Sequence, residues 1–120
     1  MTKNKIKKAL YIEDEPYYRT IYGGELERAG IEMTYVGNGE EALDEIKKNK
    51  FDLIIADLIM PLMSGISFLK ETQGKKLNTI VLTTLEGNED REDCKALGVD
   101  HFLVKTETTP KKLLKEIEKL

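Results

Sequence analysis

Five polar residues of this chain directly follow short apolar runs that are typical of buried strands. They are Glu13, Asp14, Asp57, Thr83 and Lys105. If the runs form parallel strands, their carboxyl ends meet along one edge of the sheet, where open α/β sheets bind ligands. We therefore expect three carboxylates, one hydroxyl and one ammonium around a single crevice.

The chemistry that this set favours is the binding of Mg²⁺ and of a phosphoryl group. Three converging carboxylates repel one another unless a cation is present. Oxygen ligands with room for water suit Mg²⁺, whereas zinc prefers the His and Cys that are missing here. A phosphoryl group would bridge the metal ion and the ammonium of Lys105, with Thr83 as a hydroxyl donor. The pattern predicts a phosphoryl group on, or near, Asp57.

The elements that would position these residues alternate along the chain. Short apolar segments predict strands at 9–12, 31–36, 51–56, 79–83 and 102–104. Helical spacing and end signals predict helices at 16–29, 40–48, 65–72, 88–97 and 110–120. Strands that are apolar on both faces belong in a parallel sheet with helices on each side. We expect a doubly wound α/β fold with a five-stranded parallel sheet flanked by five helices.

The composition excludes several classes of protein. The 120 residues suit one domain and leave no room for a separate output domain. No apolar run approaches the roughly 18 residues of a membrane-spanning helix, and the run after the lysine-rich start is too short for a signal peptide. A net charge of -3 argues against direct binding of nucleic acid. We expect a cytoplasmic domain over residues 5–120, without a membrane partner, preceded by a short tail over residues 1–4.

Four segments in this order resemble the motifs of the response regulator receiver domains of two-component systems, of the single-domain chemotaxis-regulator type. They are 10–16, 51–65, 81–84 and 98–105. Each motif alone is weak evidence, but the four together, at these spacings, are specific and extend the resemblance from about Lys5 to Leu120. The resemblance implies a flavodoxin-like fold with strand order 2-1-3-4-5 and a signalling protein that carries an aspartyl phosphate.

The resemblance also implies roles at the metal side of the site. Asp57 would accept a phosphoryl group from a phosphohistidine on a sensor histidine kinase or a histidine phosphotransfer protein. Mg²⁺ would be bound by Asp14, Asp57 and the backbone carbonyl of Ile59, and Glu13 would act through a metal-bound water. The chain would assist its own phosphorylation and dephosphorylation, and it would not be a turnover enzyme for an external substrate.

On the phosphate side, the resemblance implies contacts from Thr83, Thr84 and Lys105 to phosphoryl oxygens. Movement of Thr83 toward the phosphate would let Phe102 turn inward, which is a local event that biases a two-state element. The readout would be a surface that we call the output face, made of residues 88–97, 102–104 and 110–120. The same face could also form a homodimer, and the sequence does not identify the downstream protein target.

The chain departs from the family pattern at several positions. Glu13 replaces a commoner Asp, and its longer stem still reaches a metal-bound water. Ser64 stands where Asp is common and serves equally as a helix cap. Thr106 stands where the family has a proline after a cis bond. A cis bond before a non-proline residue costs roughly 2.5–4 kcal/mol, so we predict a trans Lys105–Thr106 bond.

Two further positions bear on how long the phosphoryl group lasts. Ile59 and Leu85 lie two residues after Asp57 and Thr83, where family members flank the path of the hydrolytic water. Both are bulky and apolar, which predicts slow self-dephosphorylation.

The alternative class is a pseudo-receiver, an interaction module that never carries phosphate. An enzyme on the same architecture is disfavoured, because a flavin protein would not place three acids in its first loop.

Overall fold

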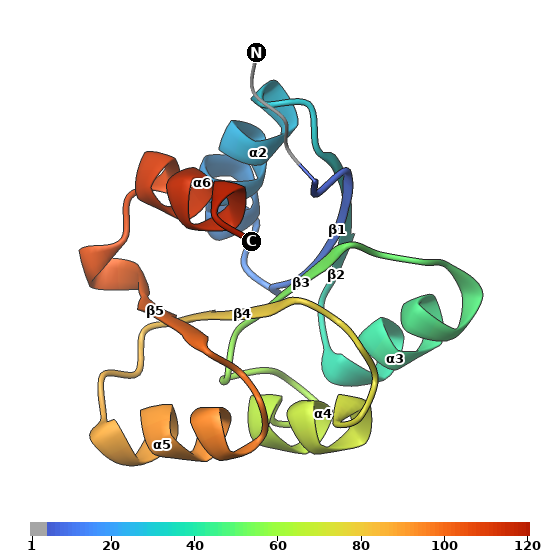
Figure 1. Ribbon diagram of the computed structural model, residues 1–120, viewed down its shortest axis with the longest axis vertical. Coiled ribbons are helices and arrows are strands. Elements are labelled where there is room, and N and C mark those ends of the chain that lie inside the picture. Colours follow the sequence, from blue (N-terminus) through green and yellow to red (C-terminus); the bar gives the residue numbers. More distant parts are fainter. Residues whose placement is uncertain (1–4) are drawn as a thin grey trace.

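The computed structural model describes residues 5–120, so the predicted tail over residues 1–4 lies outside the described residues. The five strands form one parallel sheet in the order β2-β1-β3-β4-β5, which confirms the predicted doubly wound fold (Figure 1). The strands are β1 (Lys8–Ile12), β2 (Glu32–Val36), β3 (Leu53–Ala56), β4 (Thr79–Thr83) and β5 (His101–Val104).

Helical segments connect the strands and flank the sheet. They are α1 (Pro16–Tyr18), the π-helical η1 (Arg19–Gly23), α2 (Gly24–Arg28), α3 (Gly39–Lys48), α4 (Gly65–Thr72), α5 (Asn88–Ala96), the short 3₁₀ turn η2 (Lys105–Glu107) and α6 (Pro110–Glu118). The first three follow one another without a break and together form the first predicted helix. None of the helices in residues 5–120 is long and apolar enough to cross a membrane.

The helices cover both faces of the sheet (Figure 1). The α2 and α6 helices lie on one face, and α3, α4 and α5 lie on the other. Successive side chains of a strand point to opposite faces, so β1 contributes to two cores. Tyr11 packs in the cluster that contains Leu26 and Leu113, whereas Leu10 packs in the cluster that contains Phe68. This double burial explains why the strands are apolar throughout.

The helix ends follow the signals in the sequence. The Ser64 hydroxyl accepts a hydrogen bond from the Ser67 N–H at 3.1 Å, which confirms the predicted cap of α4. The Thr109 hydroxyl accepts one from the Lys112 N–H at 3.1 Å and caps α6. Gly30 follows α2 with a φ of 93°, a conformation that glycine adopts without strain.

The adjacent glycines Gly23 and Gly24 differ in what surrounds them. A Cβ atom on Gly23 would lie 2.1 Å from the Tyr35 hydroxyl oxygen, so the absence of a side chain lets η1 pack closely on β2. A Cβ atom on Gly24 would meet nothing nearer than the Arg28 Nη1 at 3.4 Å. Close packing therefore requires glycine at the first position and not at the second.

We predict opposite effects for the two alanine variants. Gly23→Ala is expected to lower the free energy of unfolding by about 1–3 kcal/mol, because Tyr35 must move. Gly24→Ala is expected to raise it by up to about 1 kcal/mol, because alanine favours a helix over glycine. Urea denaturation followed by circular dichroism measures both, and equal shifts would contradict the packing argument.

The single cysteine predicts a pH dependence of stability. Burial, together with the nearby Asp90 and Asp93, raises the pKa of the Cys94 thiol from 9.0 to about 11. The unfolded chain therefore loses this proton at lower pH than the folded chain, so the thiol's contribution to stability falls as the pH rises from about 9 to about 11. We expect wild type to lose more stability than Cys94→Ala between these two pH values in urea denaturation. Equal losses of stability in wild type and Cys94→Ala would show that the Cys94 thiol does not contribute to the pH dependence.

Candidate functional site

The register of the sheet brings the predicted residues to one edge. Ile12 of β1 lies opposite Ala56 of β3, so the residues that follow them, Glu13 and Asp57, leave neighbouring strands at the same level. On the other side, Thr83 of β4 lies opposite Val104 of β5, and Lys105 follows directly. The carboxyl ends of β1, β3, β4 and β5 thus place these residues together, as predicted.

Lys105 is the centre of the site. Its Nζ donates hydrogen bonds to the Glu13 Oε1 at 2.5 Å and to the Asp57 Oδ2 at 2.8 Å. All three side chains are buried, with 3%, 1% and 8% of the lysine, glutamate and aspartate side chains exposed. One ammonium therefore compensates two buried carboxylates, which leaves the group with a net negative charge.

Burial and pairing set the protonation of these groups. Burial alone would lower the pKa of Lys105, but its hydrogen bonds to Asp57 and Glu13 outweigh burial and raise that pKa. The ammonium is therefore charged at neutral pH. Burial raises the pKa of the Glu13 carboxyl, against the hydrogen bonds from Lys105 and from the Glu15 N–H.

The remaining carboxylate oxygens differ in their partners. The Asp57 Oδ1 accepts a hydrogen bond from the Ile59 N–H at 3.1 Å, and the Glu13 Oε2 accepts one from the Glu15 N–H at 3.1 Å. Asp14 is exposed, and no hydrogen bond joins its carboxylate to the rest of residues 5–120. Asp14 is thus the acid that is available to an incoming group.

An open pocket of about 460 Å³ contains this edge of the sheet. Of the predicted site residues, it is lined by Glu13, Asp14, Asp57, Ile59, Thr84 and Lys105. Thr83 does not line it. Thr83 is fully buried, and its hydroxyl accepts a hydrogen bond from the Leu85 N–H at 3.3 Å. The structure therefore gathers the acids and the ammonium, and it places Thr84 rather than Thr83 in the pocket.

Phe102 is buried among the core residues on the side of the sheet covered by α5. The guanidinium of Arg91 lies over its ring, with Cζ 4.7 Å from the ring centroid, and Nη1 donates to the Phe102 carbonyl at 3.3 Å. The predicted switch aromatic is thus in contact with α5, and only 8% of it is exposed.

The donor set fits Mg²⁺ in its chemistry. Asp14, Asp57 and the backbone at Ile59 offer oxygen atoms around an open pocket with room for water, which is how proteins hold this ion. Counted as formal charges, the three acids Glu13, Asp14 and Asp57 with Lys105 sum to two negative charges, which a divalent cation balances. Within residues 5–120, no group of three acids, histidines or cysteines is already arranged around one ion position, and the carboxylate of Glu13 is turned toward Lys105.

The loop after Lys105 has the predicted backbone. Residues 5–120 contain no cis peptide bond, which confirms a trans Lys105–Thr106 bond. The chain turns through η2, and the Thr108 N–H donates to the Lys105 carbonyl at 3.3 Å.

Two tyrosines of the site were not predicted from the sequence. Tyr18 lines the pocket, and Tyr22 contacts the loop after Lys105. Of the two tyrosines that follow Pro16, Tyr17 is 67% exposed and Tyr18 is half-buried, so only Tyr18 packs toward the site.

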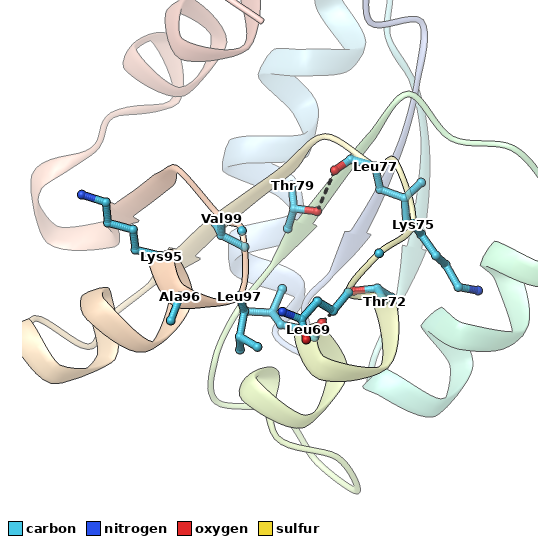
Figure 2. Close-up of a pocket in the computed structure, with 12 residues that line it drawn as sticks. Leu69, Thr72, Lys75, Leu77, Thr79, Lys95, Ala96, Leu97 and Val99 are labelled. Carbon is cyan, nitrogen blue, oxygen red and sulfur yellow. Dashed lines mark hydrogen bonds between the residues drawn. The ribbon is translucent and has the colours of Figure 1, made fainter.

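A second pocket, of about 310 Å³, lies near the amino end of β4, between α4 and α5 (Figure 2). Lys75 and Lys95 flank apolar side chains there, and the Thr79 hydroxyl donates to the Leu77 carbonyl at 3.5 Å. None of its lining residues is an acid, a histidine or a cysteine. Of these two pockets, the strand-end pocket is therefore the candidate for chemistry.

Comparisons with known proteins agree with the geometry. The sequence profile of the response regulator receiver domain matches residues 9–118. The alkaline phosphatase synthesis transcriptional regulatory protein PhoP of Bacillus subtilis (strain 168) is 33% identical over 101 residues, which are 82% of this chain and 42% of PhoP. The chain thus spans less than half the length of this relative.

Solved structures give the same result. The chemotaxis response regulator CheY4 of Vibrio cholerae superposes with a TM-score of 0.86 at 32% identity, covering 96% of this chain and 98% of CheY4. The receiver domain of the sensor histidine kinase PA1611 of Pseudomonas aeruginosa PAO1 gives a TM-score of 0.83 at 25% identity, covering 94% and 95%, and holds a magnesium ion in its active site cleft. From its fold, its strand-end pocket and these relatives, the chain belongs to the response regulator receiver domains of two-component signalling systems.

Proposed function

We propose that this domain is a cytoplasmic phosphoryl-accepting switch in which Asp57 takes a phosphoryl group from a phosphohistidine, with Mg²⁺ as cofactor. The observation that carries the proposal is the environment of Asp57. Its carboxylate lines an open pocket, and the ammonium of Lys105 lies 2.8 Å from one of its oxygens. A nucleophilic oxygen and a fixed cation are thus side by side where a phosphoryl group has room to enter.

The transfer is an in-line displacement at phosphorus. A carboxylate oxygen of Asp57 forms the new P–O bond, the P–N bond of the phosphohistidine breaks, and its electron pair returns to the histidine nitrogen. Such transfers depend mainly on positioning and on neutralising the charge of the phosphoryl oxygens. Lys105 supplies a positive charge for this purpose, and Thr84, which lines the pocket, supplies a hydroxyl.

The proposed metal ligands are Asp14, Asp57 and the Ile59 carbonyl, with Glu13 acting through a bound water. When bound, Mg²⁺ supplies further positive charge for the phosphoryl oxygens and balances the acids. The free carboxylate of Asp14 supports this assignment, because it is exposed in the pocket. Glu13 contributes mainly by holding Lys105, because its Oε1 accepts a 2.5 Å hydrogen bond from the lysine Nζ.

The proposed relay runs through Thr83 and Phe102 to the output face, which α5, β5 and α6 form. The Thr83 hydroxyl, which here accepts a hydrogen bond from the Leu85 N–H, turns to donate its proton to a phosphoryl oxygen, and the loop after β4 moves with it. Phe102 is already largely buried, so its response is a repacking against Arg91 and α5 rather than a large loss of exposed area. A partner that binds the output face would sense this repacking.

The test separates a phosphoryl acceptor from a pseudo-receiver. The protein is incubated with Mg²⁺ and acetyl phosphate, and intact mass spectrometry is expected to show a mass increase of one phosphoryl group that hydroxylamine removes. Asp57→Asn is the matched control, since it keeps the shape of the side chain and removes the nucleophile. A wild-type protein that gains no mass, or an Asp57→Asn variant that gains as much, would overturn the proposal.

We expect the lifetime of the phosphoryl group to depend on Ile59. Ile59 is 55% exposed and lines the pocket, whereas Leu85 packs against the core. An amide at position 59 can orient an attacking water, so Ile59→Asn is expected to speed phosphoryl loss severalfold. The decay of the added mass after removal of the donor measures the rate. A rate equal to that of wild type would refute the role of this side chain.

The proposed partners are a sensor histidine kinase or phosphotransfer protein as donor and a downstream protein at the output face. The alternative is that a second copy of this chain binds the output face and forms a homodimer. A pull-down with and without a beryllofluoride phosphate mimic, combined with the oligomeric state by light scattering, distinguishes them. A partner that depends on the mimic supports the switch, and identical binding in both states contradicts it.

A further inference from the structure

The ammonium of Lys105 lies against the face of an aromatic ring. Its Nζ is 3.8 Å from the ring centroid of Tyr18, within the range at which a cation is attracted to an aromatic face. This attraction strengthens when water is excluded, and only 3% of the lysine side chain is exposed. Tyr18 thus completes the surroundings of an ammonium that already bonds to Glu13 and Asp57.

A second tyrosine holds the backbone from which Lys105 projects. The Tyr22 hydroxyl donates to the Thr108 carbonyl at 2.6 Å and lies 3.2 Å from the Lys105 carbonyl. These two carbonyls bracket η2, so a single hydroxyl ties both ends of the turn to the helix. Tyr22 and Thr108 are 2% and 5% exposed, so these hydrogen bonds are shielded from water.

The two tyrosines act from one helical segment. They are four residues apart, the spacing at which side chains of a helix stand on the same face. Their rings stack, with centroids 6.2 Å apart and planes at 25°. The ring that faces the ammonium is therefore itself supported by the ring whose hydroxyl holds the loop.

We propose that Tyr18 and Tyr22 are positioning residues of the phosphoryl site: the ring of Tyr18 orients the ammonium of Lys105 toward Asp57, and the hydroxyl of Tyr22 fixes the turn that carries it. This inference rests on the proposed phosphoryl-accepting function. Neither tyrosine bonds to the phosphoryl group in this role. Their effect is that Lys105 is already in place when the phosphoryl group arrives, so its charge acts without the cost of ordering a long flexible side chain.

The first experiment tests the contact without any phosphoryl chemistry. Protons above the face of an aromatic ring are shifted upfield by its ring current, so the Cε protons of Lys105 should show this shift in a spectrum of the selectively labelled protein. The shift is expected to persist in Tyr18→Phe, which keeps the ring, and to vanish in Tyr18→Leu. An unshifted Lys105 in wild type would overturn the inference.

The second experiment measures the initial rate of phosphorylation as the concentration of acetyl phosphate is varied. Tyr18→Leu is expected to lower the maximal rate about fivefold to thirtyfold, the effect of one desolvated cation–π contact. Tyr18→Phe should keep the maximal rate of wild type. We expect the loss in Tyr18→Leu to lie in the maximal rate and not only in the affinity for acetyl phosphate. Tyr22→Phe, which removes the hydroxyl alone, should lower the rate about fivefold.

Tyr17→Phe is the matched control, because Tyr17 is exposed, precedes Tyr18 directly, and the variant keeps the edge-on contact between the two rings, whose centroids lie 5.3 Å apart. It should phosphorylate at the wild-type rate. If wild type accepts a phosphoryl group and Tyr18→Leu does so equally fast, the positioning role is overturned while the proposed function stands. If wild type accepts none, the proposed function fails, and the inference fails with it even where the ring-current shift is present.

Discussion

Lys105→Met is expected to lose about 3 kcal/mol of unfolding free energy at neutral pH, the low end of the cost of leaving buried charges without their partner. Methionine keeps the length of the apolar stem, so the loss measures the charge rather than the volume. Glu13 and Asp57 would then face each other with 1% and 8% of their side chains exposed and no cation between them. Guanidinium denaturation followed by circular dichroism gives the value.

Two comparisons show that charge causes this loss. Asp57→Asn leaves one ammonium beside one carboxylate, so its stability should stay within about 1 kcal/mol of wild type. Millimolar Mg²⁺ should restore more stability to Lys105→Met than to wild type, because the two carboxylates attract the cation more strongly without the ammonium, and a ligand of the folded state stabilises it more the tighter it binds. Equal losses in Lys105→Met and Asp57→Asn, or no difference in the response to Mg²⁺, would contradict this account.

The strand ends were predictable because they follow from two local rules. Apolar runs give buried strands, and the residue after each run must lie at the carboxyl edge of a parallel sheet. Glu13, Asp57 and Lys105 meet these conditions and lie together. The pairing of Lys105 with Glu13 was not predicted: Glu13 was expected to act through a metal-bound water, and the structure instead buries its carboxylate against Lys105 while Asp14, the next residue, is exposed.

Side-chain rotamers and long-range contacts were beyond the reach of the sequence. Thr83 lies at the predicted strand end, but a hydrogen bond from the Leu85 N–H keeps its hydroxyl out of the pocket. Threonine often makes such local hydrogen bonds to the backbone, and the sequence does not determine which rotamer of Thr83 is adopted. The helical spacing of Tyr22 predicts only an ordinary position in the core. Its hydroxyl finds its partner 86 residues away, and only the packed structure reveals that.

Gly65 is a similar case, since its role depends on a close approach that its position in a loop motif does not reveal. The residue begins α4, and its N–H donates to the Leu58 carbonyl at 3.0 Å. A Cβ atom on it would lie 2.4 Å from the Leu58 Cα and 2.8 Å from the Asp57 carbonyl oxygen. Both atoms belong to the backbone that carries the phosphoryl acceptor, so they cannot move aside as a flexible side chain would.

Gly65→Ala is therefore expected to displace the Asp57–Leu58 backbone as well as to destabilise the fold. We expect a loss of about 3 kcal/mol in unfolding free energy, the upper range for overpacking, and slower phosphorylation of the molecules that remain folded. Denaturation and the acetyl phosphate assay, performed well below the midpoint of unfolding, measure the two effects separately.

Ser64→Ala is the matched control for this variant, because it weakens the same helix start without entering the space beside Asp57. It removes the hydroxyl that caps α4 and should cost about 1 kcal/mol. Since the cap bonds only within α4, the rate of phosphorylation should stay at the wild-type value. If Ser64→Ala slowed phosphorylation as much as Gly65→Ala does, the stability of α4 would control the acceptor. If only Gly65→Ala slows it, the close approach of α4 to the Asp57 backbone positions the acceptor.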